Sequence, residues 1–260
     1  MAVASSQTND YQVRVFPPHK QGTGSFDGGR ITEIKPIGFR GDGASVSRVG
    51  PLFYWAWASA NGPAKIGLHP HRGFEIASYV LKGELGHADT GNHKSRIGIG
   101  GVQVMQTGSG ISHEEQTFDE TEFFQIWFEP DLREALNRVP TYREASDTEL
   151  PVKVINDVRI KSIIGGDSPI HLVTDVHVAH LTLEANATHT FDNTTDRTNA
   201  VVVIDGEFEI QTHSDELTVR DRDFLLIPEG ADTQLHAKST GGEVVVVNVP
   251  TSVSYPLLDK

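Results

Sequence analysis

Residues 69–75 read HPHRGFE, and residues 108–115 read GSGISHEE. In an extended strand, side chains two residues apart point to the same face and lie about 6.5 to 7 Å apart along the chain. His69 and His71 therefore form one pair of side chains, and His113 and Glu115 form a second. Glu114 points to the opposite face. We expect the two pairs to meet on facing strands of a β structure.

The rest of the chain also reads as strands. Short runs rich in Val, Ile, Phe, Tyr and Trp are separated by Gly, Pro, Asn and Asp, for example PLFYWAWAS, FEIASYVL, EFFQIWF and EVVVVNVP. We expect one helix, over residues 131–138, and a polar connector that runs from it to about Pro151. This pattern favours an all-β sandwich or barrel over alternating β and α units.

Composition limits the class of protein. The chain has 260 residues, of which 37% are hydrophobic, with 12 Phe and 3 Trp, so it can bury a real core. No apolar run approaches the roughly 18 residues of a membrane span, and the first residues do not resemble a secretion signal. We expect a cytoplasmic protein with no membrane partner. Because there is no cysteine, any metal must be held by His, Asp or Glu.

The charge is acidic and uneven. Residues 1–140 carry 13 Lys and Arg against 15 Asp and Glu, whereas residues 141–260 carry 9 against 20. Nucleic-acid binding depends on basic side chains that neutralise phosphates, so we expect no direct contact with nucleic acid. The acidic second half is typical of a solvated surface, and it is also a candidate for contact with protein partners.

A weak internal repeat predicts that the two halves share a fold. VLKGEL at residues 80–85 resembles VIDGEF at residues 203–208, an offset of 123 that also carries His113 onto His236. The same offset carries the other three side chains of the two pairs onto Asp192, Thr194 and Lys238. A lysine ammonium has no lone pair for a metal, so we expect the second half to be free of metal.

Three imidazoles and one carboxylate suit a first-row divalent ion, which the residue types alone leave open among Fe(II), Mn(II), Ni(II), Cu(II) and Zn(II). A single histidine is usually a surface or core residue, but two paired sets in a β-rich chain favour a metal site. His87 and His93 flank Asp89–Asn92, which has the composition of a hairpin turn, so we interpret them as structural.

At this level of detail the sequence resembles the pirin family. The strings HPHRGFE, YVLKGELGHADTGN and GVQVMQTGSGISHEE carry the resemblance, which covers most of the chain and is strongest over residues 50–130. It implies two cupin-type, jelly-roll β-barrels packed as a bicupin, with an N-terminal metal-binding domain over residues 11–140. Residues 141–260 would then hold the connector and a degenerate cupin domain. One departure is Gly100-Gly101, where relatives commonly have Gly-Asp.

The resemblance also implies a ligand set and a chemistry. It places one metal ion per chain, with iron as the expected metal, on His69, His71, His113 and Glu115. Relatives of the quercetinase type open a flavonol-like enol with O2, and in such a reaction Glu115 is the natural base. We further expect pocket walls from Phe53, Trp57 and Met105, and a polar contact from Gln125, although strand aromatics are often simple core residues.

Two other functions fit the same ligands. Some pirins are non-enzymatic, iron-binding, redox-sensing regulators that act through protein partners. A cupin can also use its metal as a Lewis acid in an isomerisation. Fold and ligands do not separate these alternatives from a dioxygenase, but the access of a bulky substrate to the metal does.

Overall fold

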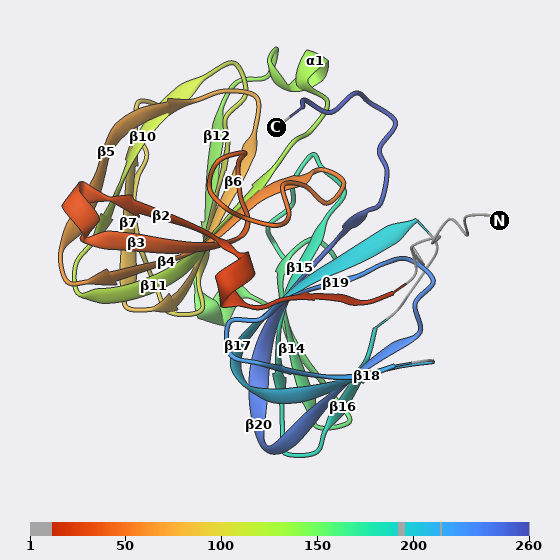
Figure 1. The fold of residues 1–260 in the computed structure, drawn as a ribbon. Helices are drawn as coiled ribbons and strands as arrows, with labels where there is room; N and C mark the ends of the chain where they lie inside the picture. The colour runs from red at the N-terminus through yellow and green to blue at the C-terminus, as the bar shows by residue number, and fades with distance from the viewer. Residues whose placement is uncertain (1–11, 192–195, 214, 260) are drawn as a thin grey trace.

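The computed structural model describes residues 12–191, 196–213 and 215–259. Figure 1 shows that these residues form two groups of β-strands, one from each half of the chain, which pack against each other. The prediction of an all-β fold is confirmed. No helix in the described part of the chain is long and apolar enough to cross a membrane.

The N-terminal half forms two sheets. A seven-stranded sheet has the order β12-β9-β6-β11-β4-β3-β2, and a four-stranded sheet has the order β5-β10-β7-β8. The strands of the larger sheet are β2 (Gly22–Phe26), β3 (Ile31–Ile37), β4 (Leu52–Asn61), β6 (Glu75–Lys82), β9 (Val102–Gln106), β11 (Glu120–Phe128) and β12 (Thr141–Ala145). Those of the smaller sheet are β5 (Ala64–His71), β7 (Glu84–Asp89), β8 (Lys94–Gly98) and β10 (Ile111–Thr117).

The C-terminal half forms one nine-stranded sheet. Its main order is β1-β19-β17-β20-β15-β14-β13, while β16 pairs with β20 and β18 pairs with β17. The strands are β1 (Arg14–Phe16), β13 (Val152–Ile155), β14 (Val158–Ile164), β15 (His177–Leu183), β16 (Thr188–Thr190), β17 (Arg197–Thr212), β18 (Glu216–Arg220), β19 (Phe224–Ile227) and β20 (Thr233–Pro250).

Strand pairing repeats in the same order in both halves. The long β17 takes the places of β6 and β7, and the long β20 takes those of β10 and β11. Gly83 and Gly206 mark the bend between the two parts, both at positive φ, a conformation that side chains with a Cβ rarely adopt. At this bend the offset of 123 holds, in agreement with the internal repeat.

Two short strands cross between the halves. β12 pairs with β9, and β1 pairs in the same way with β19 of the other half. Residues 141–145, which we expected to lie in an irregular connector, are therefore a sheet strand. A domain boundary at residue 140 stays a proposal, since each half contributes one strand to the other.

The expected helix near residues 131–138 is shorter than the sequence suggests. The α-helix α1 covers only Leu132–Ala135, and the Asp131 side chain caps it by accepting a hydrogen bond from the Arg133 amide. Three short 3-10 turns complete the regular structure: η1 (Pro18–Lys20), η2 (Asp27–Gly29) and η3 (Asp147–Glu149).

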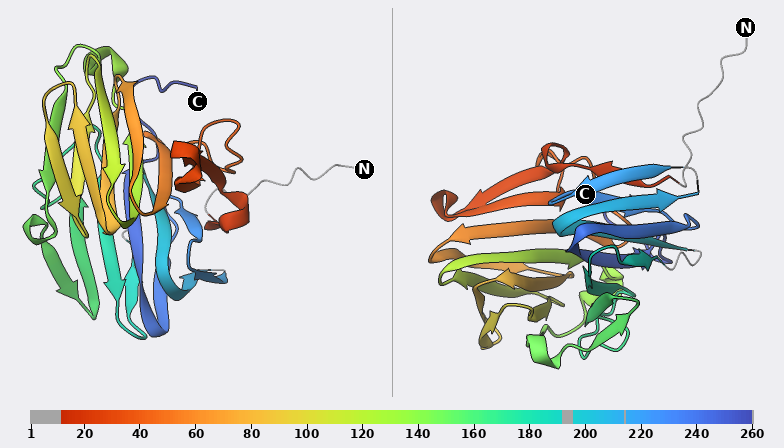
Figure 2. Two further views of the ribbon diagram at one scale, coloured as in Figure 1. Left: turned by 90° about the vertical axis from the view of Figure 1, so that its left-hand side faces the viewer. Right: turned by 90° about the horizontal axis from the view of Figure 1, so that it is seen from below.

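Side-chain alternation in the seven-stranded sheet divides the core. On β4 and β11, one face carries Trp55 and Phe124, which belong to a cluster that reaches Val245 in the C-terminal half. The other face carries Tyr54, Ala56 and Trp127, which point into the N-terminal barrel. The two halves therefore share one apolar interface, and each half also has an apolar cluster of its own. Figure 2 shows the strands of the two halves lying against each other.

Candidate metal centre

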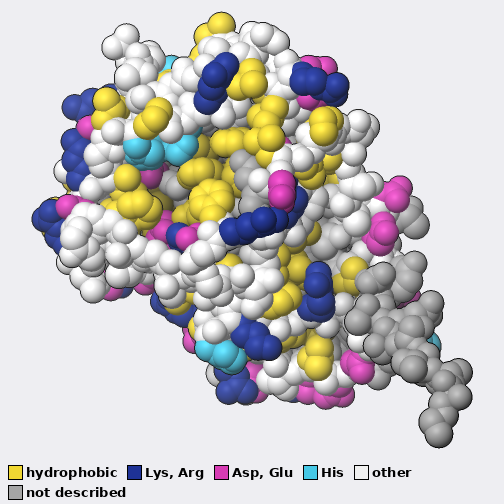
Figure 3. All heavy atoms as spheres, turned by 45° about the horizontal axis from the view of Figure 1, so that its top comes forward, with side chains coloured by type: hydrophobic (Ala, Val, Ile, Leu, Met, Phe, Trp, Pro, Cys, Tyr) yellow, Lys and Arg dark blue, Asp and Glu magenta, His cyan; other side chains and the backbone are white. Residues whose placement is uncertain are grey.

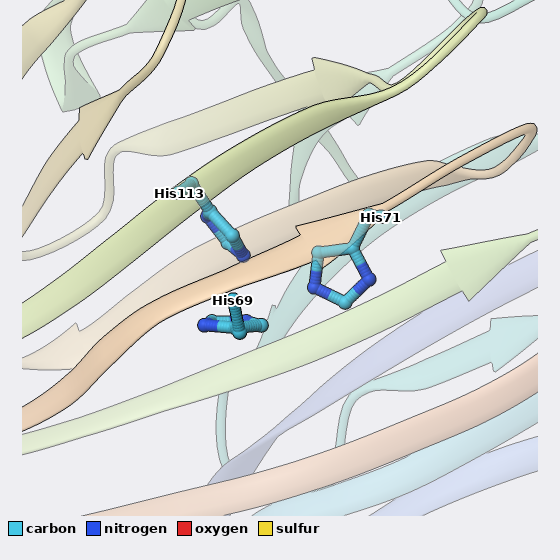
Figure 4. A group of neighbouring side chains, drawn as sticks. All are labelled: His69, His71 and His113. Carbon is cyan, nitrogen blue, oxygen red and sulfur yellow. The ribbon is translucent and has the colours of Figure 1, made fainter.

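Three histidines meet inside the N-terminal barrel. His69 and His71 lie on β5, and His113 lies on β10, where it is directly paired with His69. Their ring centroids are 4.4 to 5.0 Å apart, and one nitrogen of each lies within 4.8 Å of the others (Figure 4). The alternation argued from the sequence thus brings these three side chains together.

The nitrogens in this group are suited to a metal. The Nε2 atoms of His71 and His113 are buried and have no hydrogen-bond partner, a costly state for a polar atom unless something binds it. In His69 the Nδ1–H donates to the Gly67 carbonyl at 2.8 Å. The lone pair of this ring then lies on Nε2, the same atom that lacks a partner in His71 and His113. The residues present therefore fit a divalent ion.

Burial keeps two of these rings neutral. Burial, together with a smaller effect of the neighbouring imidazoles, lowers the pKa of His71 and of His113 to about 3. The nearby Glu115 carboxylate acts against this shift at His71. Neutral imidazole is the form that binds a metal, so these ligands are ready at neutral pH without losing a proton.

Glu115 lies beside the histidine group and is held by other residues. Its side chain is buried on the same strand face as His113. Gln125 Nε2 donates to both carboxylate oxygens, at 2.8 and 2.9 Å, and Ser78 donates to one of them at 3.4 Å. The three histidines form the compact group, and Glu115 as a fourth ligand stays a proposal.

A second layer of residues orients His113. The Asp89 carboxylate accepts from His87 Nε2 at 2.9 Å, so the lone pair of His87 lies on Nδ1, 3.4 Å from His113 Nδ1. His113 Nδ1 can then donate to it and leave its own Nε2 free. We interpreted His87 from sequence as a turn residue. Its spacing of two from Asp89 on one strand face is the signal that points to this role.

Aromatic side chains form one wall of the site. The Trp127 ring meets His71 edge-on at 4.8 Å between centroids, and its indole N–H donates to Gln125 Oε1 at 3.1 Å. Phe53 packs against Trp127 at 6.0 Å, and Met105 belongs to a small cluster that packs against the same indole. Sequence reasoning missed Trp127.

Trp57, which we expected in the pocket, points the other way. Its indole donates to Glu122 at 2.7 Å, and the Arg222 guanidinium lies 4.4 Å from the centroid of its ring system. The sequence placed Phe53 and Trp57 on one face because residues 53, 55 and 57 alternate. A register shift between β4 and β11 near residue 53 breaks this alternation, so only Phe53 joins the inner aromatic cluster.

A buried acid also faces the barrel interior. Glu33 on β3 is 5% exposed and accepts from the Tyr54 hydroxyl at 3.0 Å, while its other oxygen lacks a hydrogen bond. Burial raises the pKa of Glu33, and the Glu115 charge adds to that rise while Lys35 opposes it. The alternation of β3 was not assigned from sequence, so this residue was missed.

Comparison with known proteins assigns the chain to a family. The family model described as Pirin matches residues 55–128, which contain the three histidines. A Pseudomonas aeruginosa protein with a provisional assignment as a quercetin 2,3-dioxygenase is 32% identical over 177 residues, which are 64% of this chain and 73% of that protein. The chain belongs to the pirin family. Pirin-like protein 2 of Arabidopsis thaliana is 34% identical over 56% of this chain, a region that spans half of the plant protein.

Solved structures show the same pirin fold. The nickel(II) complex of the Escherichia coli pirin YhhW superposes with a TM-score of 0.77 at 19% identity, over 92% of this chain and 99% of that one. A quercetin 2,3-dioxygenase from Acinetobacter baumannii gives 0.79 at 18% identity, over 95% and 82%. These likenesses confirm the expected bicupin architecture.

Proposed function

We propose that this pirin is a metal-dependent dioxygenase of the quercetinase type, which opens a flavonol-like enol with O2. The observation that carries the proposal is the group of three histidines, two of them with buried, unpartnered Nε2 atoms, beside an oriented carboxylate. His69, His71 and His113, with Glu115 as a fourth ligand, would hold one divalent ion. The family resemblance favours iron.

Glu115 would act as the base. A bound divalent ion supplies one effect, a lowered pKa of the substrate's 3-hydroxyl. Gln125 holds both oxygens of Glu115, so the carboxylate is aimed before substrate arrives and can take the 3-hydroxyl proton. The flavonolate then takes up O2, and the heterocycle opens with loss of carbon monoxide. Both atoms of O2 enter the opened depside, one in the ester carbonyl formed from C2 and one in the carboxyl group formed from C4. The carbon monoxide consists of C3 with the oxygen of the former 3-hydroxyl, and the proton held by Glu115 is released to the carboxylate product or to solvent.

The surroundings of the site support access for a flat substrate. His71 also borders an open surface depression of about 440 Å³, whose other lining residues include Arg72 as well as Pro70 and Ser112 on the outer face of β5 and β10. Figure 3 shows histidine side chains at the edge of a hollow whose wall is largely hydrophobic. Trp127 and Phe53 offer apolar surface that would stack on an aromatic ring and exclude water. This access favours the enzyme over a regulator with an enclosed metal.

The proposal is tested by turnover. The protein is loaded with Fe(II) under nitrogen, quercetin and O2 are added, and loss of the flavonol absorbance is followed together with release of carbon monoxide. We expect one carbon monoxide for each flavonol lost, and no turnover in Glu115→Ala. A fully iron-loaded protein that leaves quercetin intact would contradict the proposal and favour the iron-binding, redox-sensing regulator.

A further inference from the structure

The C-terminal barrel contains a large cavity that the metal chemistry does not use. Its volume is about 620 Å³, and strands β14 to β17 and β20 supply its lining. Part of its wall is apolar, formed by Ile160, Ala179, Leu181, Phe191 and Val246, and Asp175, His177, His189 and Thr190 lie along its rim. Polar side chains lie along another part of the lining, at Arg197, Asn199 and Asn248.

Strand register shows that this cavity is the counterpart of the space around His69, His71, His113 and Glu115 in the N-terminal barrel, which we call the metal cavity. Leu85 pairs with Thr117 two residues after the bend at Gly83, and Phe208 pairs with Ala237 two residues after the bend at Gly206. Counting back from Thr117 and Ala237, Glu115 corresponds to Leu235, and His113 corresponds to Thr233. The Phe191 amide donates to the Thr233 carbonyl, which places Phe191 opposite Thr233 as His69 lies opposite His113.

This register corrects the correspondences drawn from the constant offset of 123. His236 and Lys238 do not take the places of His113 and Glu115, because β10 and the first part of β20 are offset by 120. His236 bonds Thr188 at 2.9 Å, and Lys238 pairs with Glu209. Asp192 and Thr194, the other two expected counterparts, lie outside the described residues.

The residues that hold Glu115 in the metal cavity, and the buried Glu33, are replaced by apolar side chains. Gln125 corresponds to Val246, Ser78 to Val201 and Glu33 to Ile160, by their pairing with neighbouring strands. In another part of the C-terminal cavity, polar residues stand where the metal cavity has apolar ones. There Trp127 corresponds to Asn248, and Ile76 corresponds to Asn199. The polar and apolar parts of the two cavities are thus exchanged.

The polar part offers donors and little net charge. Arg197 is paired with Asp175 at 2.8 Å and also bonds Asn248, so its charge is compensated. Asn199 is 5% exposed, and its Oδ1 accepts from Asn248 Nδ2 at 2.8 Å. Among the described residues the Asn199 amide NH2 makes no hydrogen bond, and it lines the cavity. This donor is open to a molecule in the cavity.

We propose that the C-terminal barrel binds a small neutral molecule with an apolar body and one terminal oxygen acceptor, without metal. The apolar body fills the space between Ile160, Leu181 and Val246, and the oxygen accepts from the Asn199 NH2. An anion is disfavoured because Arg197 is already paired, and among the described lining residues the one carboxylate, Asp175, is paired with Arg197 and does not favour a cation.

The proposal is tested by calorimetric titration of the full-length, metal-free protein with 2-naphthol. We expect one site per chain, and about tenfold weaker binding of naphthalene, which lacks the oxygen and so loses one hydrogen bond. 2-Naphthoate is the charged comparison and should bind more weakly than 2-naphthol. Equal binding of naphthalene and 2-naphthol would remove the proposed role of Asn199.

A pair of variants on β15 locates the binding. Ala179 lines the cavity, so Ala179→Leu fills part of it and should lower the affinity for 2-naphthol at least tenfold. Thr182→Leu places the same side chain on the opposite face of the strand and should leave binding unchanged. Thermal melts check that both variants fold. No saturable binding, or binding that survives Ala179→Leu in a folded protein, would overturn the proposal.

Discussion

At the scale of single residues, the site depends on which polar atoms lack a partner. His71 and His113 each present a buried Nε2 with nothing bound to it, while Glu115 has its oxygens occupied by Gln125 and Ser78. The two Nε2 atoms are therefore free to bind a ligand. In the proposed function, the carboxylate that Gln125 orients takes up the substrate proton. Gln125 links this carboxylate to the aromatic wall through Trp127.

Gln125 acts in this scheme as a positioning residue. Gln125→Met has a similar volume but cannot donate to Glu115, so we expect quercetin turnover to fall roughly tenfold to a hundredfold. Metal content should stay near that of the wild type, because all four proposed ligands are kept. The matched control is Gln116→Met, on the exposed face of β10. Turnover equal to the control would contradict the role of Gln125.

Glu33 predicts a dependence of stability on pH. Its raised pKa means that the folded state binds the proton more tightly, which adds stability below the ordinary pKa of a glutamate. That contribution is lost as the pH rises through the raised value. Glu33→Gln should therefore gain melting temperature relative to the wild type at pH 8, and gain less at pH 5. A gain in melting temperature that becomes smaller as the pH rises would contradict this prediction.

At the scale of elements, the two-residue alternation of strands could be read from the sequence wherever a strand is regular. It predicted that His69 and His71 share a face and that His113 and Glu115 share a face; β10 shifts its register against β5 between the latter two, but its pairing with β7 is unbroken there. It failed where the register shifts, as at Phe53 and Trp57. The constant offset failed for a related reason, since loops of different length separate equivalent strands of the two barrels.

The contact between β6 and β15 joins one element from each half. The Tyr79 hydroxyl bonds His180 Nδ1 at 2.8 Å, and His180 Nε2 bonds Glu243 at 2.8 Å. Tyr79→Phe leaves a buried nitrogen unpaired and should lower the free energy of unfolding by about 1–2 kcal/mol. Urea titrations of Tyr79→Phe, His180→Ala and the double variant measure the coupling. Strictly additive effects would mean that this bond does not stabilise the interface.

At the scale of the whole molecule, the two halves form one interlocked unit. They exchange β1 and β12, share an apolar core and are tied by buried charges. The Glu75 carboxylate of β6 accepts from the amides of Val173 and Thr174 at 2.7 and 2.9 Å. Arg48 and the Leu258 amide both bond the buried Glu129, which fixes the C-terminal segment to the N-terminal half.

This interlocking predicts a single unfolding transition in calorimetry. Glu75→Ala removes a buried acceptor from two amides and should lower the free energy of unfolding by about 3 kcal/mol, with both halves still melting together. Glu84→Ala, a more exposed glutamate paired with Arg96, should change it by less than about 1 kcal/mol. Two separate transitions in the wild-type protein would contradict the shared core.

The central claim is that His69, His71 and His113, with Glu115, hold one divalent ion in each chain. The most direct test is the metal content, by mass spectrometry, of protein dialysed with Fe(II) under nitrogen. We predict one ion per chain in the wild type and in His236→Ala, whose imidazole bonds Thr188 in the C-terminal half. His71→Ala and Glu115→Ala should lose most of the metal while circular dichroism shows an intact β fold. Full occupancy in both folded variants, or two ions in the wild type, would contradict the assignment.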